Sequence, residues 1–452
     1  MSLLRIAWRN FRHRSLSSFL TTLSLALGVG LVVLVLSIYG IISEAFVRNA
    51  SVGPNLVVGA AGDGLQLTLN SIFYLSQPIE NLDYTDYMDF MSEQQRSDQV
   101  ERYGGDPALA EEDGRYYALL GGGYAIPLAL GDYFGSFRLV GTTPDFFEKL
   151  RHGPMVDQEF TMREGRAFET FNDEHGYFEA VLGSRVASVM DVRVGDVINP
   201  THGNPEGKLH SEGFTVVGIL DPTGTPNDRA AFINLEGFYL MEGHARPAPE
   251  GQNYEPTIPP PADWPKPLTI PEREITALLI RNGNLMFAPI MSNMIKETKT
   301  RQAVAPIGEI NKLMSVIVGP LLTALMVITL LTCIVAAVGV LVAIYNSMND
   351  RRKDIAVMRA LGARRGTVTS VILIESLLIA VIGGVMGWLG AHLAIWIASG
   401  AIEEQTGIQV GFWSTSFYEW LVLPLVVALA LLAGLLPALS AYRTDVGSNL
   451  SA

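Results

Sequence analysis

Long uncharged stretches alternate with charged ones along this chain, and they predict membrane-spanning helices. Residues 15–43, 313–349 and 421–442 contain no Asp, Glu, Lys or Arg, and residues 367–402 contain only Glu375. Each stretch exceeds the roughly 20 residues that a helix needs to cross a hydrocarbon core of about 30 Å. The pattern predicts an α-helical integral membrane protein with four transmembrane helices, one before and three after a long polar segment.

These stretches divide the chain into successive parts. We expect an amphipathic cytoplasmic helix at 1–14, transmembrane helices at 15–45, 313–346, 367–400 and 417–442, a large extracytoplasmic domain at 46–312, a cytoplasmic coupling helix at 347–366, a short periplasmic loop at 401–416 and a cytoplasmic tail at 443–452.

The distribution of Lys and Arg beside these stretches predicts their orientation. Four arginines precede the first stretch and six basic residues lie within 351–365, whereas 401–416 has no Lys or Arg and carries Glu403 and Glu404. Loops rich in Lys and Arg remain in the cytoplasm. We therefore expect both termini and the middle link to be cytoplasmic, in a multi-pass protein of a bacterial inner membrane.

The first thirteen residues form a second membrane signal. Apolar residues such as Leu4 and Trp8 fall on one helical face and Arg5, Arg9 and Arg12 on the other. This pattern is typical of a helix that lies in the membrane interface. The alternative is a secretory signal peptide cleaved after residue 45, but the uncharged run is about twice as long as a normal signal core.

The segment 46–312 carries enough periodic structure to form a mixed α+β domain, long enough for two subdomains. Apolar runs between Gly, Pro and Asp turns predict strands, and 3.6-residue patterns predict helices. The predicted strands are 55–59, 116–120, 136–140, 180–182, 213–220, 230–234 and 274–281, and the predicted helices are 144–150, 235–242 and 285–299. The Pro-rich stretch 243–271 predicts an extended loop.

Charge and cysteine content argue against several classes of function and site. The chain has a formal net charge of −13, and residues 47–312 hold 37 acidic and 21 basic side chains. This acidic balance argues against nucleic-acid binding. The single cysteine, Cys333, lies in the second apolar stretch and rules out an intramolecular disulfide and a cysteine-based zinc site.

The link 345–375 reads YNSMNDRRKDIAVMRALGARRGTVTSVILIE. Ile355, Met358 and Leu361 share one helical face, basic residues cover much of the rest, and Gly362 stands where a helix would end. The pattern predicts a short helix along the membrane surface. An ordinary basic loop is the alternative, but it would explain neither the apolar stripe nor the glycine.

This link resembles the signature of MacB/FtsX-type ABC transporter permeases. Further short motifs match the periplasmic core domain of MacB-like permeases in order: VGTTPDFF at 140–147, REGRAF at 163–168, VLGSRVA at 181–187, VGDVI at 194–198 and FTVVGIL at 214–220. The resemblance covers nearly the whole chain. It implies that the link docks on a nucleotide-binding subunit through Arg352, Asp354, Met358, Arg359, Leu361 and Gly362. One departure is Asp354, because the family usually has glutamate there.

No GxxxxGK[ST] phosphate-binding loop occurs in the sequence, so we expect this chain to be no enzyme and to bind no cofactor. The resemblance then implies a separate ABC ATPase dimer that uses ATP and Mg²⁺, and a second copy of the permease. The implied function is export or extraction of a periplasmic or membrane-anchored cargo by mechanotransmission, in which ATP-driven motion is relayed to the periplasmic domain.

Two alternatives stay open: an FtsX-like transducer that activates a cell-wall hydrolase without transport, and a lipoprotein-releasing permease. The further candidate partners are a periplasmic adaptor, a lipoprotein, a hydrolase and the lipid bilayer. Cargo identity has no signature in the sequence.

Three individual side chains are candidates for function. Glu375 lies inside a transmembrane stretch, where a carboxylate is a functional candidate by default, and we favour a structural or coupling role over a proton or substrate site. His202 and His210 share a loop with Glu206 and Glu212 and are weak candidates for a divalent-metal site. Their spacing fits no standard ligand pattern, and solvated loop histidines are commoner. Glycines at 28, 30, 383, 384 and 387 would allow transmembrane helices to approach closely.

Overall fold

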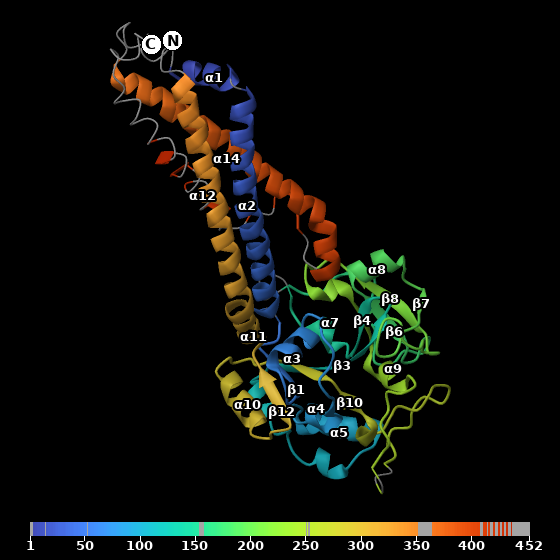
Figure 1. The fold of residues 1–452 in the computed structure, drawn as a ribbon. Coiled ribbons are helices and arrows are strands. Elements are labelled where there is room, and N and C mark those ends of the chain that lie inside the picture. The colour runs from blue at the N-terminus through green and yellow to red at the C-terminus, as the bar shows by residue number, and fades with distance from the viewer. Residues whose placement is uncertain are drawn as a thin grey trace. The chain divides into compact units, whose positions relative to one another are not determined.

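A computed structural model describes residues 3–13, 15–51, 53–152, 158–249, 251, 254–350 and 364–406, with scattered positions between 410 and 435. The chain forms two compact units (Figure 1). The helical unit comprises Met1–Glu44 and Ser315–Ala452, and the α/β unit comprises Ala45–Met314. The predicted coupling helix and most of the predicted fourth transmembrane helix lie outside the described residues.

The helical unit is built from long apolar helices. It contains α1 (Leu3–His13), α2 (Ser15–Ser51), α12 (Gly319–Asp350) and α14 (Arg365–Thr406). Within the described part of the chain, three helical stretches are long and apolar enough to cross a membrane: Ser18–Val47, Pro306–Gly339 and Thr369–Ile402. These correspond to the first three transmembrane helices predicted from the sequence.

Small residues bring α2 and α14 into close contact. A Cβ atom on Gly30 would lie 3.1 Å from the carbonyl oxygen of Gly387, and one on Gly387 would lie 2.5 Å from the carbonyl oxygen of Ala26. Apolar side chains gain little from leaving lipid for another helix, so backbone approach through small residues is a main source of packing energy here. The glycine pattern in the sequence therefore corresponds to a real helix contact.

One mixed sheet runs through the described α/β unit in the order β12-β1-β11-β3-β4-β9-β6-β8-β5, with β7 paired to β8, and β10 pairs separately with β2. The strands are β1 (Leu56–Ala60), β2 (Leu82–Asp83), β3 (Tyr124–Phe134), β4 (Phe137–Thr142), β5 (Met162–Gly165), β6 (Glu179–Leu182), β7 (Val197–Ile198), β8 (Phe214–Leu220), β9 (Ala230–Asn234), β10 (Glu274–Ile275), β11 (Ala277–Arg281) and β12 (Arg301–Val304). The pairs β4–β9 and β6–β8 are parallel and the other pairs are antiparallel.

Short helices flank this sheet. They are α3 (Gly64–Ser71), α4 (Tyr84–Met88), α5 (Glu93–Tyr103), α6 (Tyr117–Leu120), α7 (Asp145–Lys149), α8 (Ser184–Met190), α9 (Leu235–Leu240), α10 (Phe287–Lys296) and α11 (Pro306–Leu313). Single 3₁₀ turns lie at Pro107–Ala110, Pro226–Arg229 and Ile270–Glu272, and a π-helical turn lies at Met314–Val318.

Both faces of the main sheet are buried. Along β1, Leu56 and Val58 belong to one apolar cluster, while Val57 between them belongs to another on the opposite face. Helices α4, α8, α9 and α10 contribute to the first cluster, and α3 and α7 to the second. This double burial explains why strands such as β9 are continuous apolar runs in the sequence.

One sheet runs through the described unit, and the division into two subdomains that the sequence predicted stays a prediction. Strand β3 pairs with β11 on one side and β4 on the other and so joins the two halves of this sheet. This strand was missed, because Pro127 and Gly131 interrupt its apolar pattern. Pro127 is tolerated because the ladder between β3 and β4 begins one residue later, at Leu128.

The predicted strand at 116–120 is wrong, since Tyr117–Leu120 is the helical turn α6. Gly121 ends this turn with a φ of 58°, a left-handed value that glycine adopts without strain. An apolar run this short has no periodicity that separates helix from strand.

A buried ion pair fixes the end of the extended loop to the core. Arg273, fully buried, donates two hydrogen bonds of 2.8 Å to the two carboxylate oxygens of Glu236 on α9. Its guanidinium lies 3.5 Å from the centre of the Tyr103 ring. The bidentate geometry and the aromatic contact offset the cost of burying both charges.

Candidate functional site

The predicted coupling residues Arg352, Asp354, Met358, Arg359, Leu361 and Gly362 all lie outside the described residues. Helix α12 ends at Asp350 and α14 begins at Arg365, one on each side of them. The docking role of this link therefore stays a prediction.

Glu375 lies on α14, as expected, and its side chain is partly buried. Its neighbour Ser376 is fully buried and donates a 3.0 Å hydrogen bond to the carbonyl oxygen of Ile372. This part of α14 is thus partly buried, and the role of Glu375 stays a prediction.

A second carboxylate in the helical unit, which the sequence analysis did not single out, has three side-chain partners. Glu419 Oε1 accepts a 2.7 Å hydrogen bond from Ser37 on α2. Its Oε2 lies 3.0 Å from His392 Nε2 and accepts a 3.3 Å hydrogen bond from Trp388 Nε1, both on α14. His392 is fully buried and Glu419 is 5% exposed. The carboxylate thus joins α2, α14 and the segment around residue 419.

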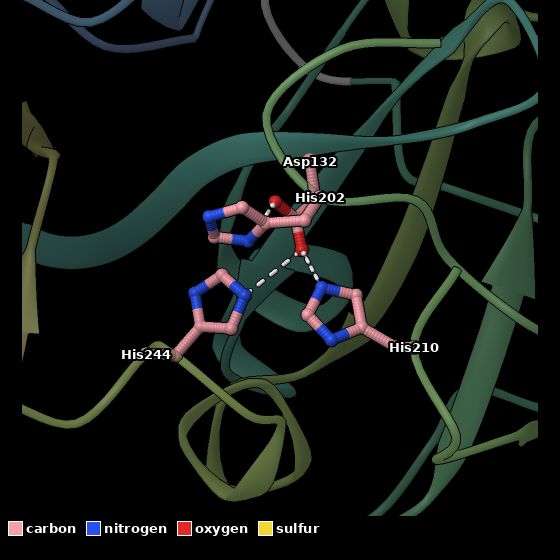
Figure 2. A group of neighbouring side chains, drawn as sticks. All are labelled: Asp132, His202, His210 and His244. Carbon is pink, nitrogen blue, oxygen red and sulfur yellow. Dashed lines mark ion pairs between the residues drawn. The ribbon is translucent and has the colours of Figure 1, made fainter. Parts of the chain in front are cut away.

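In the α/β unit, three histidines converge on one buried aspartate (Figure 2). His210 Nε2 lies 3.0 Å and His244 Nε2 lies 2.9 Å from Asp132 Oδ2, and His202 Nδ1 lies 3.4 Å from Asp132 Oδ1. The side chain of Asp132 is 1% exposed, those of His210 and His244 are 5% and 9% exposed, and that of His202 is 52% exposed. We call these four residues the histidine cluster.

The four residues of the histidine cluster come from three separate segments. Asp132 lies where the pairing of β3 with β4 shifts register, between Leu130 and Tyr133. His202 and His210 lie in the loop from β7 to β8, and His244 follows α9. A register shift of this kind turns side chains out of the regular alternation, which is a common device next to functional sites.

Backbone hydrogen bonds hold the loop between β7 and β8 against β3. Thr201 donates a 2.8 Å bond to the carbonyl oxygen of Tyr133 and accepts a 3.0 Å bond from the Tyr133 N–H. The Gly203 N–H donates to Asp132 Oδ1 at 3.1 Å and so orients the carboxylate. Phe238 packs against the His244 ring with a centroid distance of 4.3 Å.

The protonation preferences within the histidine cluster follow from burial and charge. Burial raises the pKa of Asp132, but the contact with His244 and the Gly203 N–H outweigh it, so this pKa lies below its usual range. Burial lowers the pKa of His210, and this effect exceeds the opposing attraction of Asp132. At neutral pH the Asp132 carboxylate is therefore ionised and the His210 imidazole is neutral.

The structure brings the two sequence candidates His202 and His210 together, with ring centres 5.4 Å apart. Neither Glu206 nor Glu212 belongs to the cluster, in which the carboxylate is Asp132 and the third imidazole is His244. Asp132 and His244 were missed because each lies far from residues 202–210 in sequence and no ligand spacing links them. The only available signal was the polar Gly131-Asp132 pair within an apolar run.

Two family models match this chain. The MacB-like periplasmic core domain matches residues 18–255, which is more than half of the chain, and the FtsX-like permease C-terminal domain matches residues 326–446. These two matches correspond to the resemblance seen in the sequence motifs.

Known proteins agree with these matches. An uncharacterized ABC transporter permease of Methanocaldococcus jannaschii is 23% identical over 322 residues, which cover 69% of this chain and 68% of that protein. The macrolide export ATP-binding/permease protein MacB of Rhodopirellula baltica is 23% identical over 288 residues, covering 62% of this chain and 38% of that protein.

The protein of the same name from Neisseria meningitidis serogroup A is 35% identical over 102 residues, covering 19% of this chain and 16% of that protein. This chain thus spans well under half of the length of these two MacB proteins. Within the described residues, it has the apolar helices and the large α/β unit that the two family models lead one to expect. The chain belongs to the MacB/FtsX-type ABC transporter permeases.

Proposed function

We propose that this permease relays ATP-driven motion from a separate cytoplasmic ATPase to its α/β unit, which then acts on a periplasmic or membrane-anchored cargo. In this arrangement both termini and the link 347–366 face the cytoplasm, and the α/β unit faces the periplasm of a bacterial inner membrane. Membership of the ABC transporter permeases implies an ATPase partner. The residues that would dock on it are those of the link, with Met358 and Leu361 on its apolar face.

The observation that carries this proposal is that both covalent connections between the two units are helical. Helix α2 continues from Ser15 to Ser51 through the boundary between Glu44 and Ala45. Helix α11, the π-helical turn Met314–Val318 and α12 follow one another without a break. A helix is held by a hydrogen bond at each residue, so it passes on a displacement that a flexible loop would absorb.

The π-helical turn in the second connection adds to this reasoning. A π-helical turn departs from the regular hydrogen-bond pattern and occurs often at functional positions. It lies at the boundary of the two units, since the α/β unit ends at Met314. We propose that this turn is where the second connection adjusts when the helices move.

The exposed apolar surface of α12 supports contact with a second copy of the chain. Only 6% of the best apolar window in Pro306–Gly339 is buried, against 53% for Ser18–Val47. Leu321, Leu331 and Val335 are each more than half exposed. Lipid and a second permease are the two apolar surroundings that would cover such a helix, and a homodimer would match an ATPase dimer.

The proposal can be tested by breaking one helical connection. A Gly-Gly-Ser insertion after Glu44 would interrupt α2 at the boundary of the two units, and the same insertion after Glu112, in an exposed loop of the α/β unit, would serve as the control. In a Cys333→Ser background, a spin label on Glu297→Cys would report the distance between the α/β units of two copies, measured by pulsed electron resonance with and without ATP.

We expect the unmodified protein and the control to change this distance on ATP binding. The variant with the insertion after Glu44 should hydrolyse ATP through its partner but show no change in distance. If that variant shows the same change in distance as the unmodified protein, the relay is wrong. The transducer and lipoprotein-releasing alternatives share the relay and differ only in what the α/β unit acts on, so an accompanying hydrolase or lipoprotein would distinguish them.

A further inference from the structure

We propose that Asp132, His202, His210 and His244 bind one divalent transition-metal ion of the zinc class. Three imidazoles and one carboxylate are the ligand types that suit Zn²⁺ and its neighbours, whereas Mg²⁺ and Ca²⁺ prefer oxygen ligands. The histidine cluster supplies one ligand atom from each residue, and all four atoms lie within 4.8 Å of one another.

Three buried polar atoms of the histidine cluster meet without forming hydrogen bonds. Asp132 Oδ2 lies within 3.0 Å of Nε2 of both His210 and His244, yet none of these three buried atoms has a hydrogen-bond partner of acceptable geometry among the described residues. All three side chains are more than nine-tenths buried. Leaving buried polar atoms unsatisfied costs about 1–3 kcal/mol for each group. A metal ion at the point on which they converge would satisfy all of them.

The histidine cluster has nearly the dimensions of a tetrahedral zinc site. In a tetrahedral zinc site with bonds of about 2.0–2.1 Å, the ligand atoms lie roughly 3.3–3.4 Å from one another. The nitrogen-to-oxygen distances here are 2.9, 3.0 and 3.4 Å. Movements of the side chains would bring the four ligand atoms, which all lie within 4.8 Å of one another, to the spacing of such a site.

Hydrogen bonds and an aromatic ring hold the ligand side chains in place. Metal-ligand side chains are generally oriented by hydrogen bonds from a second layer of groups. Here the Gly203 N–H orients the Asp132 carboxylate, and two backbone bonds between Thr201 and Tyr133 fix the loop that carries His202. The Phe238 ring limits the rotation of His244. His202, half exposed, leaves a path from solvent to the cluster.

The consequence of binding would be a link between distant segments. The ion would tie the loop between β7 and β8, and the segment that follows α9, to the central strand β3. That segment leads into the extended stretch before Ile270–Glu272. Metal binding to the folded state stabilises that state through mass action, so the ion would raise the thermal stability of these segments.

The test is metal binding by the purified full-length permease in detergent. The protein would be stripped with a chelator, dialysed, and titrated with Zn²⁺, with Mg²⁺ as the comparison, while bound metal is counted by mass spectrometry. Co²⁺ would serve as a spectroscopic probe, because a tetrahedral site gives strong visible absorption bands. We expect one Zn²⁺ per chain, no binding of Mg²⁺, and tetrahedral Co²⁺ bands.

Variants would assign the site. His210→Ala removes a buried ligand, and His202→Ala removes a half-exposed one, so the second should fold even if the first does not. We expect each of these two variants to bind zinc at least about tenfold more weakly, because the loss of a group that only orients a ligand already has an effect of this size. His175→Ala, outside the cluster, is the matched control and should bind as the unmodified protein does. The proposal is wrong if the unmodified protein binds no zinc. It is also wrong if His202→Ala binds zinc with the same affinity as the unmodified protein.

Discussion

Gly30 on α2 and Gly387 on α14 face each other so closely that a Cβ atom on Gly30 would lie 3.1 Å from the Gly387 carbonyl oxygen. A Cβ on Gly387 would lie 2.9 Å from the Gly30 nitrogen. The two helices thus meet backbone to backbone, and the relay proposed for α2 depends on this contact because it joins the first transmembrane helix to the third.

Replacing Gly387 with alanine should separate these two helices. The added methyl group would meet backbone atoms that have no room to move, and overpacking of this kind costs about 1–3 kcal/mol. Gly390→Ala is the matched control, since a Cβ atom there meets nothing within 4 Å. Thermal unfolding in detergent should show a lower midpoint for Gly387→Ala alone. Equal midpoints for the two variants would contradict the close contact.

Loss of Glu236 should destabilise the α/β unit more than loss of a surface charge. In Glu236→Ala the fully buried Arg273 would keep its charge without a partner, and removing one member of a buried pair costs about 3–5 kcal/mol. Lys149→Ala removes one member of the exposed pair with Asp145 and should change stability by less than about 1 kcal/mol. Denaturant titration of both variants would measure the difference, and similar losses would refute the structural role of the buried pair.

Asp86 should stabilise the folded protein more at pH 4 than at pH 6. Burial raises the pKa of Asp86 to about 6, although Arg301 beside it acts in the opposite sense. The unfolded value is about 3.9, so between roughly pH 4 and pH 6 the folded protein binds more protons than the unfolded one. Asp86 therefore stabilises the folded protein below this pH window, and this stabilisation is lost as the pH rises through the window.

The comparison of the unmodified protein with Asp86→Asn isolates this effect. The difference in melting midpoint, unmodified minus variant, should fall as the pH increases from 4 to 6 and then level off. A difference for Asp86→Asn that rises over this window would contradict the raised pKa.

Glu419 should stabilise the helical unit through its three partners. In Glu419→Ala the buried His392 Nε2 and the partly buried Trp388 Nε1 would lose their acceptor, at a cost of about 1–3 kcal/mol for each group left unsatisfied, whereas Ser37 would keep its bond to the Val33 carbonyl oxygen. Ser399→Ala removes an exposed local bond to Trp396 and is the control. A clear drop in thermal stability for Glu419→Ala only is the expected result, and no drop would show that the contacts contribute little.

The sequence could predict those parts of the fold whose pattern is local. The apolar run 230–234 coincides with β9, and the uncharged stretches correspond to the three described long helices. The strand β3 could not be read in the same way, because Pro127 and Gly131 break its pattern while neighbouring strands supply its stability. Strand β3 forms because it pairs with neighbouring strands, and its local residue preferences do not indicate a strand.

The histidine cluster shows the same limit for a site. His202 and His210 lie in one loop and could be paired from the sequence, but Asp132 and His244 reach them only through the sheet register and the turn after α9. The coupling link is the opposite case. Its motif is local and could be identified from the sequence, and its docking role stays a prediction because these residues lie outside the described part of the chain.

The coupling link makes its own prediction. Met358→Glu places a charge on the apolar face of the predicted docking helix, and Gly362→Pro changes its end. Both variants should insert into the membrane normally but fail to couple ATP hydrolysis to cargo handling. Met358→Leu keeps the apolar surface and is the control. Normal cargo handling by well-expressed Met358→Glu protein would contradict the assignment.

The most direct test of the central claim is to purify the tagged permease in mild detergent and identify bound proteins by mass spectrometry. The relay from a separate motor predicts an ABC ATPase in an amount equal to the permease, retained by Met358→Leu and lost from Met358→Glu. If no ATPase is recovered even after crosslinking, the permease has no energy source and the relay is wrong.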